Sequence, residues 1–327
     1  MPKPMSKPMS KPTLAQDRAR ASTAPVVSRR AAAPVSGEFL VRPDPSDPRL
    51  VHRVRGFDQA GQPIETAVPA ERPLTLYLNG QEIVTMMTIG DYPEHLAVGY
   101  LLNQNMLRAD DRVAAVEYDD DLGVIVVRTA RKTDYEAKLR KKTLTSGCAQ
   151  GTAFGDVMEK FERVALDPAA RVKTSWLYAL SKKINLVPSI YLEAGAIHGC
   201  VLCEEDRPLV YMEDVGRHNA IDKIAGYMHS HAIAPAGKLF YTTGRLTSEM
   251  VIKCVQMGIP ILISRSGFTA SGVELARKAN LTLIGRLKGR RFLVLAGEAR
   301  VVYDADIQAI GDEDKRVQRK ASVAADD

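Results

Sequence analysis

The sequence predicts an α/β protein of two domains, a strand-rich N-terminal domain followed by a layered α/β domain. Short strand patterns dominate residues 38–142, with one amphipathic helix among them. Within residues 156–305, strand and helix patterns alternate, as they do in a layered α/β domain with a largely parallel portion in its sheet. A chain of 327 residues, 45% hydrophobic and 26% charged, is long enough to bury a core in each domain.

Both ends of the chain differ in composition from the rest. Residues 1–37 repeat Lys-Pro-Met-Ser and hold seven Lys and Arg against one Asp, which accounts for the whole net charge of +6. We expect a disordered basic extension there and a charged tail over residues 306–327. Because the remaining 290 residues are electrically neutral, the composition gives no reason to expect a nucleic-acid-binding protein.

In the first domain we expect two strand pairs and one helix. Asn79-Gly80 is a typical hairpin turn between the first two strands, and the helix spans about residues 92–107. The predicted strands are 75–78, 82–85, 113–118 and 124–127. The basic connector that follows, residues 131–142, is typical of a solvated helix face, although its charge would also lower the pKa of a nearby thiol.

In the second domain each strand leads into a turn that could hold a ligand. The predicted strands are 195–203, 209–213, 238–242, 260–264, 281–284 and 291–296. The predicted helices are 175–183, 217–229, 247–257 and 270–279. Ligands of open α/β sheets bind at the carboxyl ends of the strands, so the turns that follow these strands are the first candidates.

Between the two domains, residues 143–155 form a run of small, polar residues around one thiol, Cys148. Gly147, Gly151 and Gly155 allow positive φ, which favours a mobile loop. A thiol in a loop can be reached by a reaction partner, whereas a buried free cysteine acts as a small hydrophobic residue. Cys148 is therefore a candidate nucleophile; the alternative is an ordinary loop residue.

The four cysteines and the N-terminus bear on the cellular compartment. Four cysteines in so long a chain do not make a disulfide framework, and the N-terminus lacks the apolar segment of a secretory signal. The longest apolar runs are only as long as a strand. We expect a cytoplasmic protein with no membrane partner.

His198, Cys200 and Cys203 lie within six residues and are competent zinc ligands. Side chains on a strand alternate between its faces, so Cys203 would point away from the other two. No second ligand pair follows nearby. We therefore predict no metal site, and favour a strand histidine beside small buried thiols.

The segment from Glu213 to Lys223 is rich in groups that can bind or move a proton. Gly216 would end a strand, and Arg217 and His218 would then begin a helix, where they could hold an anion or transfer a proton with Asp214. The alternative is helix capping with surface ion pairs.

Two turns, residues 242–249 and 264–271, share one design: a hydrophobic strand is followed by Gly, Ser, Thr and Arg and then by a helix. Free amides, hydroxyl groups and Arg at a helix N-terminus suit phosphate. A third segment, residues 286–291, places four cations between two strands, although a solvated turn explains it equally well. The predicted binding residues of the two turns are Gly244, Arg245 and Ser266.

Taken in order, these segments resemble the formate dehydrogenase accessory sulfurtransferase family. The resemblance covers about residues 38–300. The motifs that carry it are Ser146-Gly147-Cys148, Gly195-Ala196-Ile197-His198, the segment from Glu213 to Lys223, Thr243-Gly244-Arg245, Gly258-Ile259-Pro260-Ile261 and the segment from Asn280 to Gly285.

The resemblance implies a sulfurtransferase. It would take sulfur from a cysteine desulfurase as a Cys148 persulfide and pass it to the molybdenum (or tungsten) bis(molybdopterin guanine dinucleotide) cofactor of formate dehydrogenase. The resemblance also implies that the segment linked to binding this cofactor includes Arg286, Leu287, Lys288, Gly289, Arg290 and Arg291. The cofactor would be a bound substrate; no permanent cofactor or zinc is implied. His198, His218 or Asp214 would donate or accept protons during the transfer.

The same resemblance implies a homodimer whose C-terminal half has the cytidine deaminase fold without its zinc signature. Better-known members carry Cys-x-x-Cys where this chain has Cys148-Ala149-Gln150-Gly151, so a mechanism with two loop cysteines is not available here. A one-cysteine relay remains. The alternatives are a cofactor-binding chaperone that transfers no sulfur, and a zinc hydrolase of the deaminase type.

Overall fold

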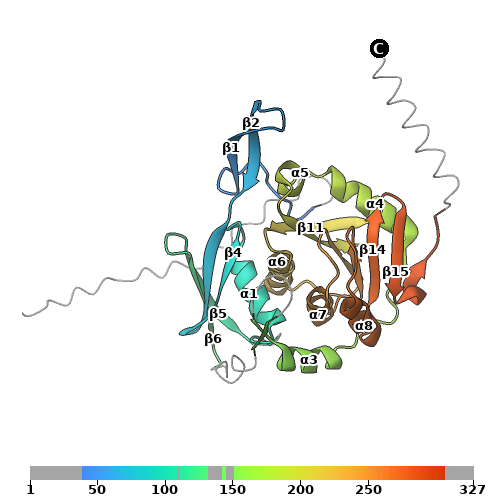
Figure 1. The fold of residues 1–327 in the computed structure, drawn as a ribbon. Helices are drawn as coiled ribbons and strands as arrows, with labels where there is room; N and C mark the ends of the chain where they lie inside the picture. Colours follow the sequence, from blue (N-terminus) through green and yellow to red (C-terminus); the bar gives the residue numbers. More distant parts are fainter. Residues whose placement is uncertain (1–38, 109–110, 132–141, 145–150, 306–327) are drawn as a thin grey trace, which may run out of the picture. The chain divides into compact units, whose positions relative to one another are not determined.

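A six-stranded mixed sheet forms the centre of the second half of the chain in the computed structural model, which describes residues 39–108, 111–131, 142–144 and 151–305 (Figure 1). Its strand order is β11-β10-β12-β13-β14-β15. The strands are β10 (His198–Glu204), β11 (Arg207–Asp214), β12 (Lys238–Thr242), β13 (Ile261–Ser264), β14 (Thr282–Lys288) and β15 (Arg291–Ala296). Because β10 is antiparallel to both β11 and β12, and β12, β13 and β14 are parallel, the four strands β11 to β14 run in the same direction.

Helices cover both faces of this sheet. On one face, α6 (Arg217–Ser230), α7 (Ser248–Gln256), α8 (Ala270–Lys278) and α3 (Phe154–Arg163) pack on apolar side chains such as Leu202, Phe240 and Leu262. On the other face, α4 (Thr174–Leu186) packs on the alternate residues of the same strands, including Val201, Tyr241 and Ile263. Short strands β9 (Val172–Lys173) and β16 (Val301–Val302) pair beside α4.

A four-stranded sheet of order β4-β3-β6-β5 forms most of the first half. Its strands are β3 (Arg72–Leu78), β4 (Gln81–Thr88), β5 (Val113–Asp119) and β6 (Val124–Thr129), and α1 (Pro93–Asn103) packs against it through a second apolar cluster. The predicted hairpin is confirmed: Asn79 turns between β3 and β4 with a φ of +56°, a conformation that Asn tolerates better than most residues.

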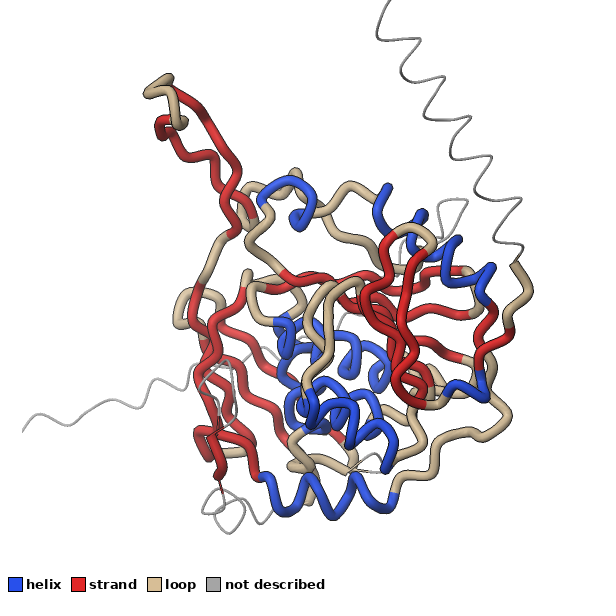
Figure 2. The backbone as a smooth tube through the Cα atoms, turned by 45° about the vertical axis from the view of Figure 1, so that its right-hand side comes forward, coloured by secondary structure: helices blue, strands red, loops and turns tan. Residues whose placement is uncertain are grey.

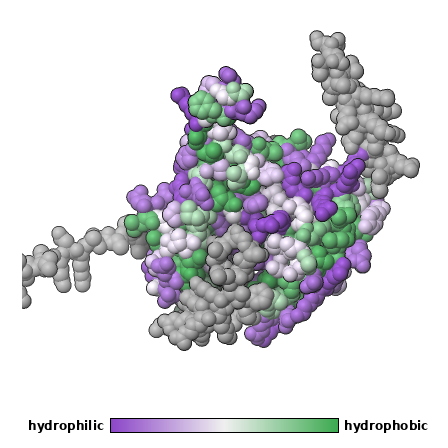
Figure 3. Space-filling view, viewed as in Figure 1, coloured by the Kyte–Doolittle hydropathy of each residue, from purple (hydrophilic) through white to green (hydrophobic). Residues whose placement is uncertain are grey.

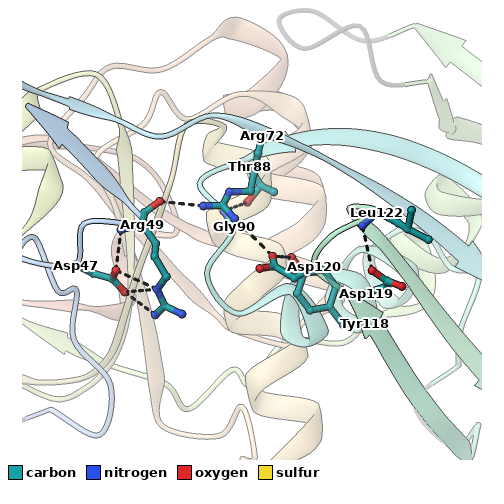
Figure 4. Close-up of polar contacts among 9 residues, drawn as sticks. All are labelled: Asp47, Arg49, Arg72, Thr88, Gly90, Tyr118, Asp119, Asp120 and Leu122. Carbon is teal, nitrogen blue, oxygen red and sulfur yellow. Dashed lines mark hydrogen bonds and ion pairs between the residues drawn. The ribbon is translucent and has the colours of Figure 1, made fainter. Parts of the chain in front are cut away.

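Arg72 ties three segments of the first half together (Figure 4). Its Nη2 donates to the backbone oxygen of Arg49, and its Nη1 lies 3.5 Å from Asp120 Oδ1 in the turn between β5 and β6. Gly90 leaves room for this side chain, since a Cβ there would lie 2.7 Å from Arg72 Cδ. Tyr118 donates to the same Asp120 carboxylate at 2.6 Å.

Helices α1 and α6 join the two sheets by packing backbone against backbone (Figures 1 and 2). A Cβ at Gly99 of α1 would lie 1.8 Å from the backbone oxygen of Asp222, and one at Gly226 of α6 would lie 1.9 Å from that of His95. Only glycine permits so close an approach at these two positions. The described residues between 39 and 305 accordingly group into one compact unit.

Two further strand pairs flank the larger sheets. β1 (Val51–Phe57) and β2 (Pro63–Pro69) form a hairpin that extends away from them and exposes Val54, Phe57 and Ile64 among polar side chains (Figures 1 and 3). β7 (Lys142–Leu144) and β8 (Gly151–Ala153) pair on either side of the Cys148 segment. Cys148 itself, residues 132–141 of the basic connector, residues 1–37 and residues 306–327 lie outside the described residues.

The structure confirms a mixed α/β fold and each predicted strand and helix named above, with shifted ends. Two boundaries were wrong. The strand predicted from residue 195 begins at His198, because Ile190–Ala194 form helix α5, which Gly195 ends with a φ of +73°. The loop predicted over residues 143–155 is wrong at both ends, because residues 143–144 and 151–153 pair as β7 and β8 and residues 154–155 begin α3. The division into two domains and the cytidine deaminase resemblance stay predictions. Among the described residues, no helix is both long and apolar enough to cross a bilayer.

Candidate functional site

The candidate site lies where β11, β12, β13 and β14 end, which we call the carboxyl edge of the six-stranded sheet. Helices α6, α7 and α8 begin there, each after the strand that precedes it in the chain. His198, the first residue of β10, lies at the same edge, opposite Asp214 at the end of β11. Backbone N–H groups at the start of three helices therefore face the edge that open α/β sheets use for ligands.

Hydrogen bonds connect the predicted turn residues across this edge. Ser264 Oγ donates to the Gly244 backbone oxygen at 2.6 Å and accepts from Ser266 N at 2.9 Å. Arg286 N then donates to the backbone oxygen of Ser266 at 2.7 Å. Gly244, Ser266 and Arg286, which are widely separated in sequence, are thus brought together.

The segment 286–291 continues β14 beyond this contact and turns into β15. Arg286 has a φ of +57°, unusual for a residue with a side chain, and its side chain is exposed. Lys288 and Arg291 are exposed partners across the hairpin, with the exposed Gly289 and the half-buried Arg290 between them. Leu287 is only 1% exposed and packs in the core, so a ligand would meet its backbone at most.

Exposed positive charge gathers around the turns. Arg245 is exposed beside Gly244, and Arg265 lies over the ring of Tyr191 at 5.3 Å. For the part of the chain that the structure describes, no carboxylate lies within ion-pair distance of Arg245, Arg286 or Lys288. An anion would therefore meet these cations without displacing an internal partner.

Arg217 lies deeper in the same region. Gly244 approaches it closely, since a Cβ on Gly244 would lie 2.9 Å from Arg217 Cδ. The Arg217 side chain is buried, and Cys200 Sγ lies 4.0 Å from the Arg217 backbone oxygen. The buried cation thus sits beneath the first of the two predicted anion-binding turns.

The two histidines of the site are in different environments. His198 is half-buried, and burial together with the nearby charge of Arg217 lowers its pKa. His218 is buried, and its Nε2 lies 3.0 Å from Glu249 Oε2 on α7. Burial lowers the pKa of His218 although Glu249 opposes the shift. The His218 side chain links the first turns of α6 and α7.

Asp214 is part of a buried ion-pair network. Its carboxylate accepts from Thr88 Oγ1 at 2.5 Å and from Asn219 Nδ2 at 2.9 Å, and lies 2.6 Å from Lys223 Nζ. Lys223 also contacts Asp91. The interpretation of this motif as surface ion pairs is therefore wrong, because both Asp214 and Lys223 are fully buried.

The sequence reasoning missed Thr88 and Asp91, the partners that the first half contributes to this network. They lie 126 and 132 residues before Asp214 and Lys223, respectively. No local pattern marks them, since an isolated Thr and an isolated Asp are common in turns.

Three of the four cysteines, Cys200, Cys203 and Cys254, are buried. Burial raises the pKa of Cys200 to about 12 and also raises the pKa of Cys203 and Cys254. As predicted, Cys200 and Cys203 face opposite sides of the sheet. Within the described ranges, no three His, Cys, Asp or Glu side chains come together as metal ligands. Cys148 is the remaining cysteine.

The flanks of the Cys148 segment are anchored away from the carboxyl edge. Leu144 pairs with Gly151, and α3 begins directly after β8. α3 packs against the C-terminal ends of α7 and α8: Gln256 Nε2 donates to the Val157 backbone oxygen, and Lys278 Nζ lies 2.6 Å from Glu162 Oε1. The helix after Cys148 thus lies at the opposite end of the helices that begin at the candidate site.

A family model described as FdhD/NarQ matches residues 69–302, which include both large sheets and the whole carboxyl edge. The chain belongs to the FdhD/NarQ family. The family resemblance predicted from the sequence motifs is therefore confirmed.

This FdhD/NarQ chain is similar to sulfur carrier proteins of other bacteria and to one solved structure. It is 26% identical over 263 residues to the sulfur carrier protein FdhD of Bacillus pumilus, covering 80% of this chain and 99% of that protein. It is 29% identical over 241 residues to the sulfur carrier protein FdhD of Wolinella succinogenes, covering 72% and 83%. A solved structure described as a formate dehydrogenase accessory protein from Desulfotalea psychrophila matches with a TM-score of 0.63 and 25% identity, covering 77% of this chain and 99% of that one.

Proposed function

We propose that this protein carries sulfur for formate dehydrogenase and that Cys148 bears the sulfur as a persulfide. The names of its relatives support sulfur transport and a formate dehydrogenase accessory role. The observation that carries the assignment to Cys148 is the burial of the other three thiols, whose raised pKa values keep them protonated.

In the first step, the Cys148 thiolate attacks the outer sulfur of a persulfide on a cysteine desulfurase. A new sulfur–sulfur bond forms at Cys148, the sulfur–sulfur bond of the donor breaks, and the donor cysteine leaves as a thiolate. Only one cysteine of this chain takes part, in keeping with Gly151 standing where a second loop cysteine would follow Cys148.

The proposed sulfur acceptor is molybdenum bis(molybdopterin guanine dinucleotide), bound as a substrate at the carboxyl edge. Its phosphate groups need cations and backbone N–H groups. The exposed side chains of Arg245, Arg286 and Lys288, with the N-termini of α7 and α8, supply both. The described flanks of Cys148 are anchored near the C-terminal ends of these helices. Delivery of sulfur therefore requires a Cys148 to reach the carboxyl edge, either from the same chain or from a second copy in a homodimer.

The test is to incubate the purified protein with a cysteine desulfurase and cysteine, and to measure intact mass and peptide masses without reductant. We expect one added sulfur atom on the peptide that contains Cys148. The Cys148→Ser variant should gain none, whereas the Cys254→Ser control should gain as much as the wild type. Sulfur on another peptide, or on none, would contradict the assignment.

A chaperone that binds the cofactor without transferring sulfur is the second candidate, because the cationic edge by itself supports binding. Formate dehydrogenase activity in cells that carry only the Cys148→Ala variant separates the two. Activity equal to that of the wild type would favour the chaperone.

A further inference from the structure

Arg217 is a cation buried near the carboxyl edge of the six-stranded sheet. Its side chain is 5% exposed, and neither Nε nor Nη2 finds a hydrogen-bond partner among the described residues. These two nitrogens form the side of the guanidinium that binds two oxygens of one anion. Burying a guanidinium costs free energy unless the charge is paired. We therefore expect this edge of the guanidinium to bind a ligand.

Arg300 is a second buried arginine, with a structural role, and it can be compared with Arg217. Its side chain is 4% exposed. Its guanidinium donates to the backbone oxygen of Asp167 at 3.1 Å and 3.3 Å and to that of Asn280 at 2.9 Å. The open edge of Arg217 is therefore not a general property of buried arginines in this protein.

The surroundings of Arg217 suit an anion. His198 Nδ1, at the start of β10, has no hydrogen-bond partner in the described part of the chain either. Helix α6 begins at Arg217 after Gly216, whose residue type provides no side-chain cap, so N–H groups of its first turn remain available. Val215, Gly216 and Thr243 beside the site are only half-buried, and Arg245 is exposed.

We propose that Arg217, His198 and the first turn of α6 form a binding subsite for one phosphate group, distinct from the 286–291 segment. A guanidinium, a helix N-terminus and the nearby Arg245 supply more positive charge than a carboxylate needs and suit a dianion. The phosphate comes either from solution or from a guanine nucleotide. The nucleotide source rests on the proposed function, whereas the anion site does not.

The experiment is isothermal titration of the full-length protein with inorganic phosphate, GDP and guanosine. Because charged hydrogen bonds are lost, Arg217→Gln should weaken binding of phosphate or GDP by about 10- to 100-fold. Arg217→Lys keeps the charge without the two-nitrogen edge and should show an intermediate loss. The control Arg300→Gln, which removes a buried arginine of similar exposure, should bind like the wild type. Thermal melts establish that each variant is folded.

Arg217-dependent binding of inorganic phosphate supports the subsite with a free anion as its ligand. Arg217-dependent binding of GDP but not of guanosine supports it with a nucleotide phosphate. No binding of phosphate or GDP to the wild type, binding unaffected by either Arg217 substitution, or equal binding of guanosine and GDP would overturn it. No desulfurase is present in this titration, so its failure is separate from a failure of persulfide formation on Cys148.

Discussion

Lys223 Nζ lies 2.6 Å from Asp214 Oδ2, and both side chains are 0% exposed. Burial disfavours the charge on Lys223, but Asp214 and Asp91 outweigh this effect and raise the pKa of Lys223 above its ordinary value. The pair holds α6 to the end of β11, and through Asp91 and Thr88 it also holds the first half of the chain. The buried network therefore fixes the end of β11, which is one part of the candidate site.

Removing this lysine should strongly destabilise the protein. Lys223→Met leaves Asp214 as a buried charge with fewer partners, and we expect a loss of about 3–5 kcal/mol in the free energy of unfolding, measured with urea. The control is Arg128→Gln, which breaks the exposed pair with Glu117 and should cost less than about 1 kcal/mol. Similar losses for the two variants would contradict a structural role for the buried pair.

The contact between α1 and α6 should not tolerate a methyl group. At Gly99 or Gly226, alanine places its Cβ within 2 Å of a backbone oxygen, so the helices must separate. We expect each variant to lose about 3 kcal/mol or more, seen as a lower melting temperature. Gly56→Ala, at a position with no heavy atom within 4 Å, should melt close to the wild type.

Stability should fall as the pH rises through neutrality because of Glu213. Burial raises the pKa of this carboxyl to about 7 from 4.5, although backbone N–H groups of Tyr191 and Ile190 oppose the shift. Between these two values the unfolded chain binds fewer protons than the folded protein, so this group lowers the free energy of unfolding by up to about 3 kcal/mol as the pH rises. Measured with urea, the free energy of unfolding should decrease less between pH 5 and pH 8 for Glu213→Gln than for the wild type. An equal decrease in the two proteins would contradict this prediction.

Thiol labelling should separate Cys148 from the other cysteines. Iodoacetamide on the native protein at pH 8 should modify Cys148 alone, because the other three thiols are buried. Labelling in urea should modify all four, and native Cys148→Ser should take up no label. Rapid native labelling of Cys200, Cys203 or Cys254, read by peptide mass, would count against the assignment.

Nucleotide binding should depend on the cations of the 286–291 segment. Replacing Arg286, Lys288 and Arg291 together by Gln should weaken GDP binding by about 10-fold and reduce its salt dependence, because these side chains are exposed and contribute mainly charge. Arg128→Gln, a cation on the four-stranded sheet, is the matched control. Unaltered binding and salt dependence in the triple variant would place the nucleotide elsewhere.

The strand and helix order, the hairpin at Asn79 and the turns at Gly244 and Ser266 could be predicted from the sequence, because periodicity and turn chemistry are local. Helix α5 was missed since Ile190–Ala194 span little more than one turn, too short for a periodic pattern. The motif from Glu213 to Lys223 could be recognised as chemically rich, but its burial could not.

The sequence by itself determined the family motifs and the α/β alternation, and it named Cys148 as a candidate nucleophile. Only the tertiary structure decided that Asp214 and Lys223 are buried, that Arg217 keeps an open binding edge, and that Gly244, Ser266 and Arg286 meet. The physical reason is that burial and pairing depend on segments far apart in the chain: Thr88 and Asp91 reach their partners only when α1 packs on α6.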